Sequence, residues 1–320
     1  MSRTPDFFIV GAPKCGTTAL NDYLARHPDV FVPGRKEIHF FGSDLVFTRP
    51  RMNRDAYLRL FDDGNGRKRA GEASVWYLYS QRAAREIRDF SPQARILIML
   101  RHPVDMMYSL HSQRLYDGNE DLRDFADALA AEPERQRGAR LPRHFANPMD
   151  FFYRDAARFA QQVRRYFETF GRERCHVILF DDLQRDVARV YRNACAFLDV
   201  DSDFRPGFPV VNANKNVWSR RLRDLLRFPS PAARSRIRAI LPSAAVRKTL
   251  KRRLLSLNGR HAERPPIDPE LRRTLDEEFL PEIRELGRLL DVDLVARWCR
   301  RPAETDAPLR QASVPDARAS

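Results

Sequence analysis

The sequence predicts an α/β fold, a three-layer sandwich in which a central, mostly parallel sheet is flanked by helices on both faces. Short apolar runs alternate along the chain with segments in which apolar residues recur at helical spacing, a pattern typical of βαβ units. The strongest run, residues 94–100, is almost entirely apolar, as expected for a strand buried on both faces of a parallel sheet. Parallel neighbours need crossover connections, so helices are expected on both sides.

The first elements are a strand, a glycine-bounded turn and a helix. Residues 6–10 are expected to form a short buried strand, and residues 17–26 a helix with its apolar side chains on one side. His27-Pro28 ends that helix, because the residue before a proline avoids the helical region. A second short strand is expected at residues 30–33.

The remaining elements follow from the same two periodicities. Pro103 suits the first turn of the helix that follows the strongest strand. Residues 117–148 are polar and charged and contain proline, so we expect a surface excursion with a helix in it. Further helices are expected at residues 55–61, 81–89, 104–113, 155–170 and 186–197, and a further strand at residues 176–180.

Length and composition favour one large domain. The chain has 320 residues, of which 43% are hydrophobic and 31% charged, enough for a core and a polar surface. We expect that domain over residues 1–300 and a disordered tail over residues 301–320, which lack apolar periodicity. No run approaches the roughly 18 apolar residues that span a bilayer, and no signal-peptide pattern is present, so a cytoplasmic protein is expected.

The cysteines give no sign of a metal site or a disulfide framework. None of the four lies in a Cys-x-x-Cys pair or another metal-binding spacing. Scattered thiols in a large cytoplasmic chain are expected to be reduced. The four residues are Cys15, Cys175, Cys195 and Cys299.

The turn after the first strand is the first candidate binding site. Residues 11–18 are Gly-Ala-Pro-Lys-Cys-Gly-Thr-Thr, and backbone N–H groups in such a turn converge at the positive end of the following helix, which favours an anion. The Gly-x4-Gly spacing matches the start of a Walker A loop. However, Thr17 and Thr18 stand where that loop has Lys-Ser/Thr, and the lysine is Lys14, inside the loop. This displacement argues against ordinary ATP or GTP hydrolysis.

This segment resembles the 5'-phosphosulfate loop of sulfotransferases that use 3'-phosphoadenosine 5'-phosphosulfate (PAPS). The resemblance implies a P-loop-like sandwich, PAPS as the sulfonyl donor and a reaction that needs no metal. It also implies that the loop, which we name the phosphate loop, holds the 5' end of the donor. The residues concerned are Gly11, Lys14, Cys15, Gly16, Thr17 and Thr18.

A second anchor for the donor follows the strongest strand. Arg101 comes directly after that strand, and Ser109 lies about two helical turns further on. An arginine at the carboxyl end of a parallel strand points into the crevice where open α/β sheets bind ligands, and a guanidinium suits bidentate contact with phosphate. The pattern resembles the family's 3'-phosphate signature. It therefore implies that Arg101 and Ser109 bind the 3'-phosphate.

The candidate base lies in residues 36–41, Lys-Glu-Ile-His-Phe-Phe. Sulfonyl transfer needs a base for the acceptor's proton and positive charge on the departing phosphate. Glu37 can be that base if its apolar neighbours raise its pKa, and Lys14 can neutralise the leaving group. His39 could assist Glu37, orient it or act as the base itself. The segment resembles the Glu-x-His-Phe-Phe stretch of heparan sulfate and related bacterial sulfotransferases, in which the glutamate is the base.

A weaker match concerns the acceptor. Residues 71–77 resemble the family's Glu-x-Ser/Thr-Pro-x-Tyr stretch near the acceptor site, which implies acceptor contacts from Glu72 and Ser74 besides Glu37 and His39. The proline of that pattern is replaced, as is the lysine that heparan enzymes often carry after the glutamate, which puts a heparan-like acceptor in doubt. A carbohydrate, a polysaccharide, a glycolipid and a small metabolite all remain open.

The resemblance extends toward the end of the chain. Asn214 and Lys215 fall in a segment that resembles the late Asn-x-Ser/Thr-Lys stretch, which closes over the nucleotide in the family. Residues 265–298 resemble the ending common in bacterial members. Together the likeness covers roughly residues 5–300.

Much of the net charge of +14 is concentrated in one segment. Residues 218–264 contain 14 Arg or Lys and only two acidic residues, interleaved with Leu and Ile at helical spacing. This segment is interpreted as a basic helical flap or insertion. Its basic face is either simply solvated or contacts an anionic polymer or an anionic membrane surface, which would make the protein peripheral at the inner membrane.

Two other functions fit parts of the sequence. A P-loop kinase or NTPase needs a Mg²⁺-binding aspartate after a strand, and Asp181 follows one, but Lys14 is misplaced for it. A nucleic-acid-binding protein would suit the charge, but no recognised reader motif is present, and the phosphate loop would have no role. No specific nucleic-acid partner is therefore expected.

Overall fold

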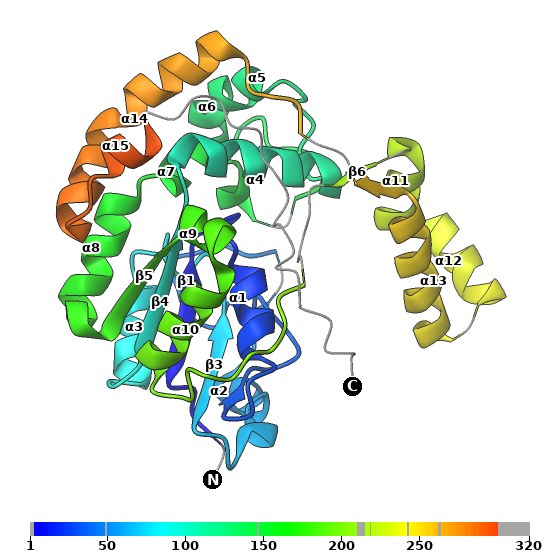
Figure 1. Ribbon diagram of the computed structural model, residues 1–320. Helices are drawn as coiled ribbons and strands as arrows, with labels where there is room; N and C mark the ends of the chain where they lie inside the picture. Colours follow the sequence, from blue (N-terminus) through cyan, green and yellow to red (C-terminus); the bar gives the residue numbers. More distant parts are fainter. Residues whose placement is uncertain are drawn as a thin grey trace, which may run out of the picture.

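The computed structural model describes residues 3–48, 50–145, 147–209, 215–217, 219–241, 243–261 and 264–299. A five-stranded sheet lies at the centre of the main body, and helices flank it (Figure 1). The predicted α/β fold is confirmed. The tail expected at residues 301–320 lies outside the described residues, and so does Asn214.

All strands of this sheet run parallel, in the order β2-β3-β1-β4-β5. They are β1 (Phe7–Gly11), β2 (Val30–Phe31), β3 (Arg69–Ala73), β4 (Arg95–Leu100) and β5 (Cys175–Leu179). Four of them lie within two residues of the predicted strands. Because parallel strands end at the same edge, the loops after β1, β2, β3 and β4 meet there. That edge holds the candidate site.

β3 is the strand that the sequence does not predict, because Arg-Ala-Gly-Glu-Ala lacks β-branched and aromatic residues. It forms because it lies between two other strands and pairs with both. Gly71 of β3 lies opposite Phe7 of β1, and Arg69 of β3 lies opposite Val30 of β2. A Cβ at Gly71 would collide with the Phe7 carbonyl oxygen, so this close pairing needs glycine. The strand carries Glu72 into the interior.

The helices form a layer on each side of the sheet. Those of the main body are α1 (Thr17–Leu24), α2 (Arg54–Arg59), α3 (Ala83–Phe90), α4 (Pro103–Asp117), α5 (Phe125–Ala130), α6 (Glu132–Gln136), α7 (Tyr153–Ala156), α8 (Phe159–Phe170), α9 (Phe180–Arg185), α10 (Val187–Leu198), α14 (Pro269–Leu290) and α15 (Leu294–Trp298). α1 and α10 contact the strands of one face, α3 and α8 pack together on the other, and α14 packs outside α8 (Figure 1). Right-handed crossovers explain the two layers, since the chain moves along the sheet in opposite directions after β1 and after β3.

The segment at residues 117–148 is more buried than its polar sequence predicts. The Arg135 guanidinium forms a two-pronged ion pair with the Glu120 carboxylate, with both N–O distances at 2.7 Å, and the Tyr153 hydroxyl also donates to that carboxylate at 2.7 Å. Arg135 is only 1% exposed. A buried pair is stable when every partner is satisfied, as here. The expected helix is present as α5 and α6, and most of the segment is exposed or half-buried, but this buried ion pair anchors it and α5 packs against α4.

The basic segment forms an arm, residues 219–258, that projects from the main body (Figure 1). It contains α11 (Arg220–Arg227), α12 (Pro231–Ile240) and α13 (Ala244–Leu257), and its ends meet in the antiparallel pair β6 (Lys215–Val217) and β7 (Gly259–His261). α11 is attached to the end of α4, because Arg227 Nη1 donates to Asp117 Oδ1 at 2.7 Å and Arg223 donates to the Leu115 carbonyl. The arm is thus a helical insertion between α10 and α14.

Within the described ranges, no helix combines the length and the apolar character needed to cross a bilayer. No group of three or more His, Cys, Asp or Glu side chains in those ranges is arranged to hold a metal ion. All four cysteines are free thiols.

Candidate active site

The phosphate loop lies at the carboxyl edge of the sheet, between β1 and α1. Gly16 precedes α1 in the left-handed conformation, with φ at 87°, and a Cβ there would lie 2.6 Å from Leu183 Cδ2. Glycine therefore permits both the turn and the close packing. α1 begins with Thr17 and Thr18, and the backbone N–H groups of its first turn have no partner within the helix. These groups lie at the end of the loop.

Gly11 and Cys15 shape the loop, and they present mainly backbone groups to a ligand. A Cβ at Gly11 would lie 2.6 Å from the Val75 carbonyl oxygen, so glycine allows the loop to pass close to the segment after β3. The Cys15 thiol is buried, and burial raises its pKa to about 12. A neutral, enclosed thiol has no direct part in chemistry at this edge.

Lys14 lies within a group of cations. Its Nζ donates to Gln113 Oε1 at 3.1 Å. Burial, together with the neighbouring charges of Arg264, Arg114 and Arg101, lowers the pKa of the Lys14 ammonium to about 8. Cations that depress one another's protonation form a place where a multiply charged anion is stabilised. The cations and the loop therefore fit a ligand with more than one phosphate-like group.

Arg101 and Ser109, predicted to bind the 3'-phosphate, both lie beside this group. The Arg101 guanidinium lies over the Phe180 ring, 4.8 Å from its centroid, and the same ring would lie 3.1 Å from a Cβ at Gly16. Ser109 Oγ accepts from Arg264 Nη2 at 3.2 Å. The structure thus places both residues next to the loop, and their contact with a phosphate stays a prediction.

Lys36 connects the phosphate loop with the candidate base. Its Nζ donates to Thr17 Oγ1 at 3.1 Å, to Thr18 Oγ1 at 3.0 Å and to Glu37 Oε1 at 2.9 Å. The ammonium therefore lies at the start of α1, beside the hydroxyl groups of Thr17 and Thr18. These two threonines occupy the positions at which a Walker A loop has Lys-Ser/Thr. Lys36 has no role in the prediction from sequence, although its position directly before Glu37 is a signal for one.

Glu37 is held firmly and stays accessible. Its Oε2 accepts from the Val75 N–H at 3.0 Å and lies 3.4 Å from His39 Nε2, and its side chain is 35% exposed. Burial lowers the pKa of His39 to about 4, and the ring stacks on Phe47 at a centroid distance of 4.5 Å. A neutral imidazole at pH 7 can orient the carboxylate but is a weak base. Glu37 therefore remains the candidate proton acceptor, and His39 lies where it can orient that carboxylate.

Three of the candidate catalytic residues have an unusual backbone conformation. Lys14, Glu37 and His39 have φ angles of 63°, 58° and 54°, in the left-handed region that residues other than glycine rarely adopt. Hydrogen bonds hold the last two in place, from the Glu37 N–H to the Ala73 carbonyl at 3.0 Å and from the His39 N–H to Ser74 Oγ at 3.1 Å. Such outliers concentrate where a site must be held in one geometry.

Glu72 and Ser74, predicted to contact the acceptor, lie beneath the base-carrying segment 36–41. Glu72 is 1% exposed and accepts from the hydroxyl groups of Tyr57 at 2.9 Å, Tyr77 at 2.8 Å and Ser74 at 2.7 Å. Tyr77 and Ser74 in turn accept from backbone N–H groups of segment 36–41. Glu72 thus supports that segment from below, and its burial does not favour direct contact with an acceptor.

Glu72 makes the stability of the fold depend on pH. Burial raises the pKa of its carboxyl group to about 7, while its three hydroxyl donors lower it. The folded-state pKa therefore exceeds the ordinary value, so this group favours folding most at acidic pH, and that contribution is lost as the pH rises to about 7. We expect Glu72→Gln to flatten the change in unfolding free energy between about pH 4.5 and 7. Urea titrations at several pH values measure this.

The matched control is Glu168→Gln, the same exchange at an exposed site on α8. Glu72→Ala should lower the free energy of unfolding by about 2–4 kcal/mol, because it leaves three buried hydroxyl groups without their acceptor. Wild-type pH dependence in Glu72→Gln would contradict this account of the carboxyl group.

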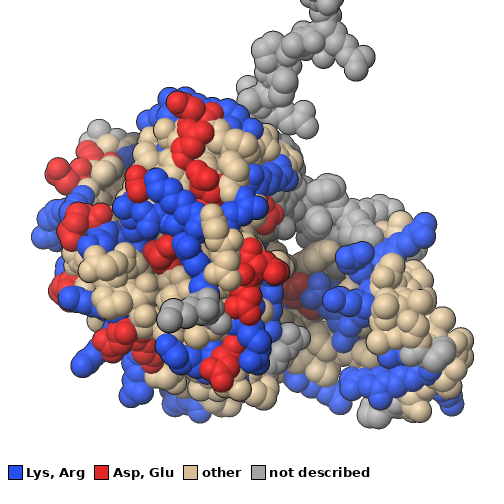
Figure 2. Space-filling model, turned by 90° about the horizontal axis from the view of Figure 1, so that it is seen from below, with Lys and Arg blue, Asp and Glu red and all other residues tan. Residues whose placement is uncertain are grey.

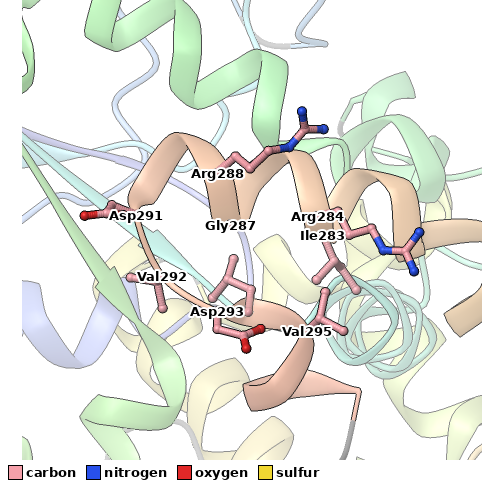
Figure 3. A pocket seen from close by; sticks show the side chains of 9 residues that line it. Ile283, Arg284, Gly287, Arg288, Asp291, Val292, Asp293 and Val295 are labelled. Carbon is pink, nitrogen blue, oxygen red and sulfur yellow. The ribbon is translucent and has the colours of Figure 1, made fainter.

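The hollow in Figure 3 lies away from the loop, at the turn between α14 and α15. It measures about 530 Å³, and its charged lining residues include Arg284, Arg288 and Asp291, whose head groups point in different directions. A second hollow of about 500 Å³ lies between Asp44 and Arg165. Neither of these two hollows is lined by a residue predicted to bind donor or acceptor, so neither is the candidate site, which charge and loop geometry mark.

Asp181, the aspartate that a P-loop kinase would need for Mg²⁺, is engaged elsewhere. It is 7% exposed, and its Oδ2 accepts from Trp298 Nε1 at 2.9 Å and lies 3.5 Å from Arg297 Nε. Both partners belong to α15, so Asp181 anchors the end of the main body. This weighs against the kinase alternative.

Together, the parallel sheet, the phosphate loop, the surrounding cations and the exposed carboxylate define an α/β protein with a candidate anion-binding loop beside a carboxylate. A family model described as a sulfotransferase domain matches residues 4–207. The chain therefore belongs to the sulfotransferase family. The match ends before the arm and before Arg264.

A solved structure extends the likeness along nearly the whole chain. The crystal structure of a sulfotransferase from Alicyclobacillus acidocaldarius is 34% identical in sequence, with a TM-score of 0.69, and the match covers 92% of this chain and 98% of that one. The family and the enzyme class are thus supported by sequence and by fold.

The matches with curated relatives cover only part of the length of those proteins. A bifunctional heparan sulfate N-deacetylase/N-sulfotransferase 1 from Caenorhabditis briggsae is 27% identical over 214 residues, which cover 64% of this chain and 23% of that protein. Carbohydrate sulfotransferase 15 from Rattus norvegicus is 33% identical over 147 residues, which cover 33% of this chain and 26% of that protein. The chain spans about a quarter of the length of these relatives.

The structure also adds residues that the sequence analysis missed. Gln113, Arg114 and Arg264 lie around Lys14, and no local motif marks them. Arg264 carried a weak signal as the last cation of the basic segment. Lys215 lies in β6, but its side chain is outside the described part of the chain.

Proposed function

We propose that this protein transfers a sulfonyl group from PAPS to a hydroxyl or amine group of an acceptor, a carbohydrate, glycolipid or other small metabolite. One observation carries the proposal: the Lys36 ammonium bonds the two threonines of the phosphate loop and the Glu37 carboxylate at once. A base held against a phosphate-binding loop is the arrangement that group transfer from a bound phosphosulfate requires.

The residues divide into two tasks. The loop N–H groups, Lys14, Thr17 and Thr18 would hold the 5' end of the donor. Arg101 and Ser109, with Arg264 beside them, would hold the 3'-phosphate. When bound, the donor supplies an activated sulfonyl group and leaves as adenosine 3',5'-bisphosphate.

Glu37 would take the acceptor's proton as the acceptor oxygen or nitrogen bonds to sulfur and the bond from sulfur to the bridging oxygen breaks. Lys14 and Lys36 would stabilise the negative charge that develops on that oxygen. His39, neutral at pH 7, would keep Glu37 oriented. These steps use only side chains of this chain and the two substrates.

Calorimetric titration with adenosine 3',5'-bisphosphate, in parallel with ATP–Mg²⁺, tests the proposal. We expect micromolar binding of the bisphosphate and none of comparable strength for ATP–Mg²⁺. Binding of ATP–Mg²⁺ without binding of the bisphosphate would instead support a P-loop kinase.

The affinity for the bisphosphate should depend on pH through Lys14. Its pKa is lowered to about 8 in the free protein, so the ammonium is charged below that value and loses its charge above it. Because the anion needs the charged form, we expect the affinity to fall by up to about tenfold per pH unit above pH 8. Titrations from about pH 7 to 9 measure this.

Lys14→Met should bind more weakly at neutral pH and show a flat profile. The matched exchange Lys248→Met, on the exposed surface of α13, should keep the wild-type profile. A flat profile in the wild-type protein would show that Lys14 does not meet the anion.

A further inference from the structure

Two helices of the arm have no core of their own. Among the described side chains of α12 and α13, none is buried. Isolated helices of 10 and 14 residues are marginal in water, because most helices in proteins are stabilised by packing an apolar face. Their stability therefore requires a surface that the main body does not provide.

The arm has exposed apolar side chains that such a surface would cover. Of the eight large hydrophobic residues that are exposed in the described part of the chain, six belong to the arm: Leu225, Ile237, Ile240, Val246, Leu250 and Leu257. Ile237 and Ile240 are three residues apart on α12, while Val246, Leu250 and Leu257 fall on one face of α13. Exposed apolar residues gathered in this way mark an interaction surface.

The same helices carry an unbalanced positive charge. Residues 229–258 contain eight Arg or Lys and no acidic residue. In Figure 2 the outer part of the arm shows blue and tan atoms without red ones, while red and blue alternate over the main body. On α13, Arg247 and Arg253 border the apolar face, while Lys248, Lys251 and Arg252 lie on the opposite side of the helix. The occupant of this surface must therefore be both negatively charged and able to accept apolar side chains.

Three occupants can be compared on these terms. A second copy of α12 and α13 would bring eight more positive charges against the first and be repelled. A nucleic acid or a sulfated polymer would match the charge but leave Ile240, 77% exposed, and Leu257, 72% exposed, without an apolar partner. A bilayer with anionic headgroups matches both, since headgroups attract the basic side chains and the acyl boundary accepts the apolar ones.

We propose that the arm docks α12 and α13 onto an anionic phospholipid surface. Docking itself does not depend on the proposed function, but the base of the arm lies close to the candidate site. Arg227 of the arm bonds Asp117 at 2.7 Å, Asp117 accepts from Gln113 at 3.1 Å, and Gln113 accepts from Lys14 at 3.1 Å. A docked arm therefore holds the phosphate loop near the bilayer and gives it access to acceptors there.

Co-sedimentation of the full chain with vesicles tests the proposal. Vesicles of phosphatidylcholine alone are compared with vesicles that also contain phosphatidylglycerol, at low and high salt and without any donor. We expect binding to the anionic vesicles to be at least about tenfold stronger and to weaken with salt. Equal binding to both vesicle types, or none to either, would overturn the proposal.

Two variants separate charge from apolar contact. Lys248→Glu/Lys251→Glu/Arg252→Glu should weaken binding to anionic vesicles about tenfold or more, because these basic residues lie within about a Debye length of the docked surface. Ile237→Ser/Ile240→Ser should weaken it about tenfold or more while leaving its salt dependence intact. All five residues are exposed, so folding should be retained.

The matched control is Arg59→Glu/Arg85→Glu/Arg192→Glu, which changes the net charge equally at exposed sites of the main body. It should bind vesicles as the wild type does. Equal losses in both triple variants would show that net charge, not the arm, drives binding, and would overturn the proposal. Binding to heparin but not to vesicles would show a polyanion surface instead. Bisphosphate calorimetry on the same samples distinguishes failure of the donor site from failure of docking.

Discussion

Glu37→Gln should lower kcat by about 100- to 10,000-fold, the usual contribution of a general base, while the affinity for adenosine 3',5'-bisphosphate stays within about threefold of wild type. The amide keeps the size of the side chain and can still accept from the Val75 N–H, which bonds Glu37 Oε2 at 3.0 Å. It cannot take the acceptor's proton. Release of the bisphosphate from PAPS, measured with whichever acceptor gives turnover, provides kcat.

The exposed exchange Glu168→Gln controls for the loss of a negative charge. His39→Asn separates the two candidate bases, since the pKa of His39 is lowered to about 4 and its imidazole is expected to orient Glu37. Its loss of kcat should be smaller than that of Glu37→Gln. A larger loss in His39→Asn, with kcat retained in Glu37→Gln, would assign the base to His39.

Arg101→Ala should raise the Kd for adenosine 3',5'-bisphosphate by about 10- to 150-fold, the range expected for losing a charged hydrogen-bonding partner of a phosphate. The prediction rests on the position of Arg101 at the end of β4, 7% exposed and over the Phe180 ring. If Arg101 meets the 3'-phosphate, the affinity for adenosine 5'-phosphate, which lacks that group, should change little. Calorimetry with both ligands gives the ratio.

Arg185→Ala, at the exposed end of α9, is the matched control and should leave both affinities unchanged. Thermal unfolding of Arg101→Ala shows whether loss of the contact with Phe180 destabilises the fold. An equal loss for the two ligands, in a variant that unfolds like wild type, would place Arg101 away from the 3'-phosphate.

Parts of the site that are local in the chain could be predicted from the sequence. Gly11 and Gly16 bound a turn between an apolar run and a helical segment, and this succession of strand, turn and helix depends on neighbouring residues only. Arg101 could be placed for a similar reason, because a residue that follows a buried parallel strand must lie at the carboxyl edge of the sheet. The pairing of Glu37 and His39 was also visible, since the two lie close in sequence.

Contacts between distant segments were not predictable in this way. Lys14 and Gln113 are 99 residues apart, and Ser109 and Arg264 are 155 residues apart, so nothing in either segment marks its partner. The burial of Glu72 was not predictable from its local sequence either. Its motif resembles an acceptor contact, but β3 is enclosed between β2 and β1. This position places the carboxyl group under segment 36–41.

The sequence by itself determined the fold class, the phosphate loop, the carboxyl-edge arginine and the basic character of residues 218–264, because each follows from composition, periodicity or residues close in the chain. Only the tertiary structure decided that Lys36 joins the loop to Glu37, that three arginines lie close enough to Lys14 to lower its pKa, and that the arm leaves its apolar side chains exposed. The physical reason is that burial and charge proximity depend on which segments the topology brings together, and local periodicity carries no information about that.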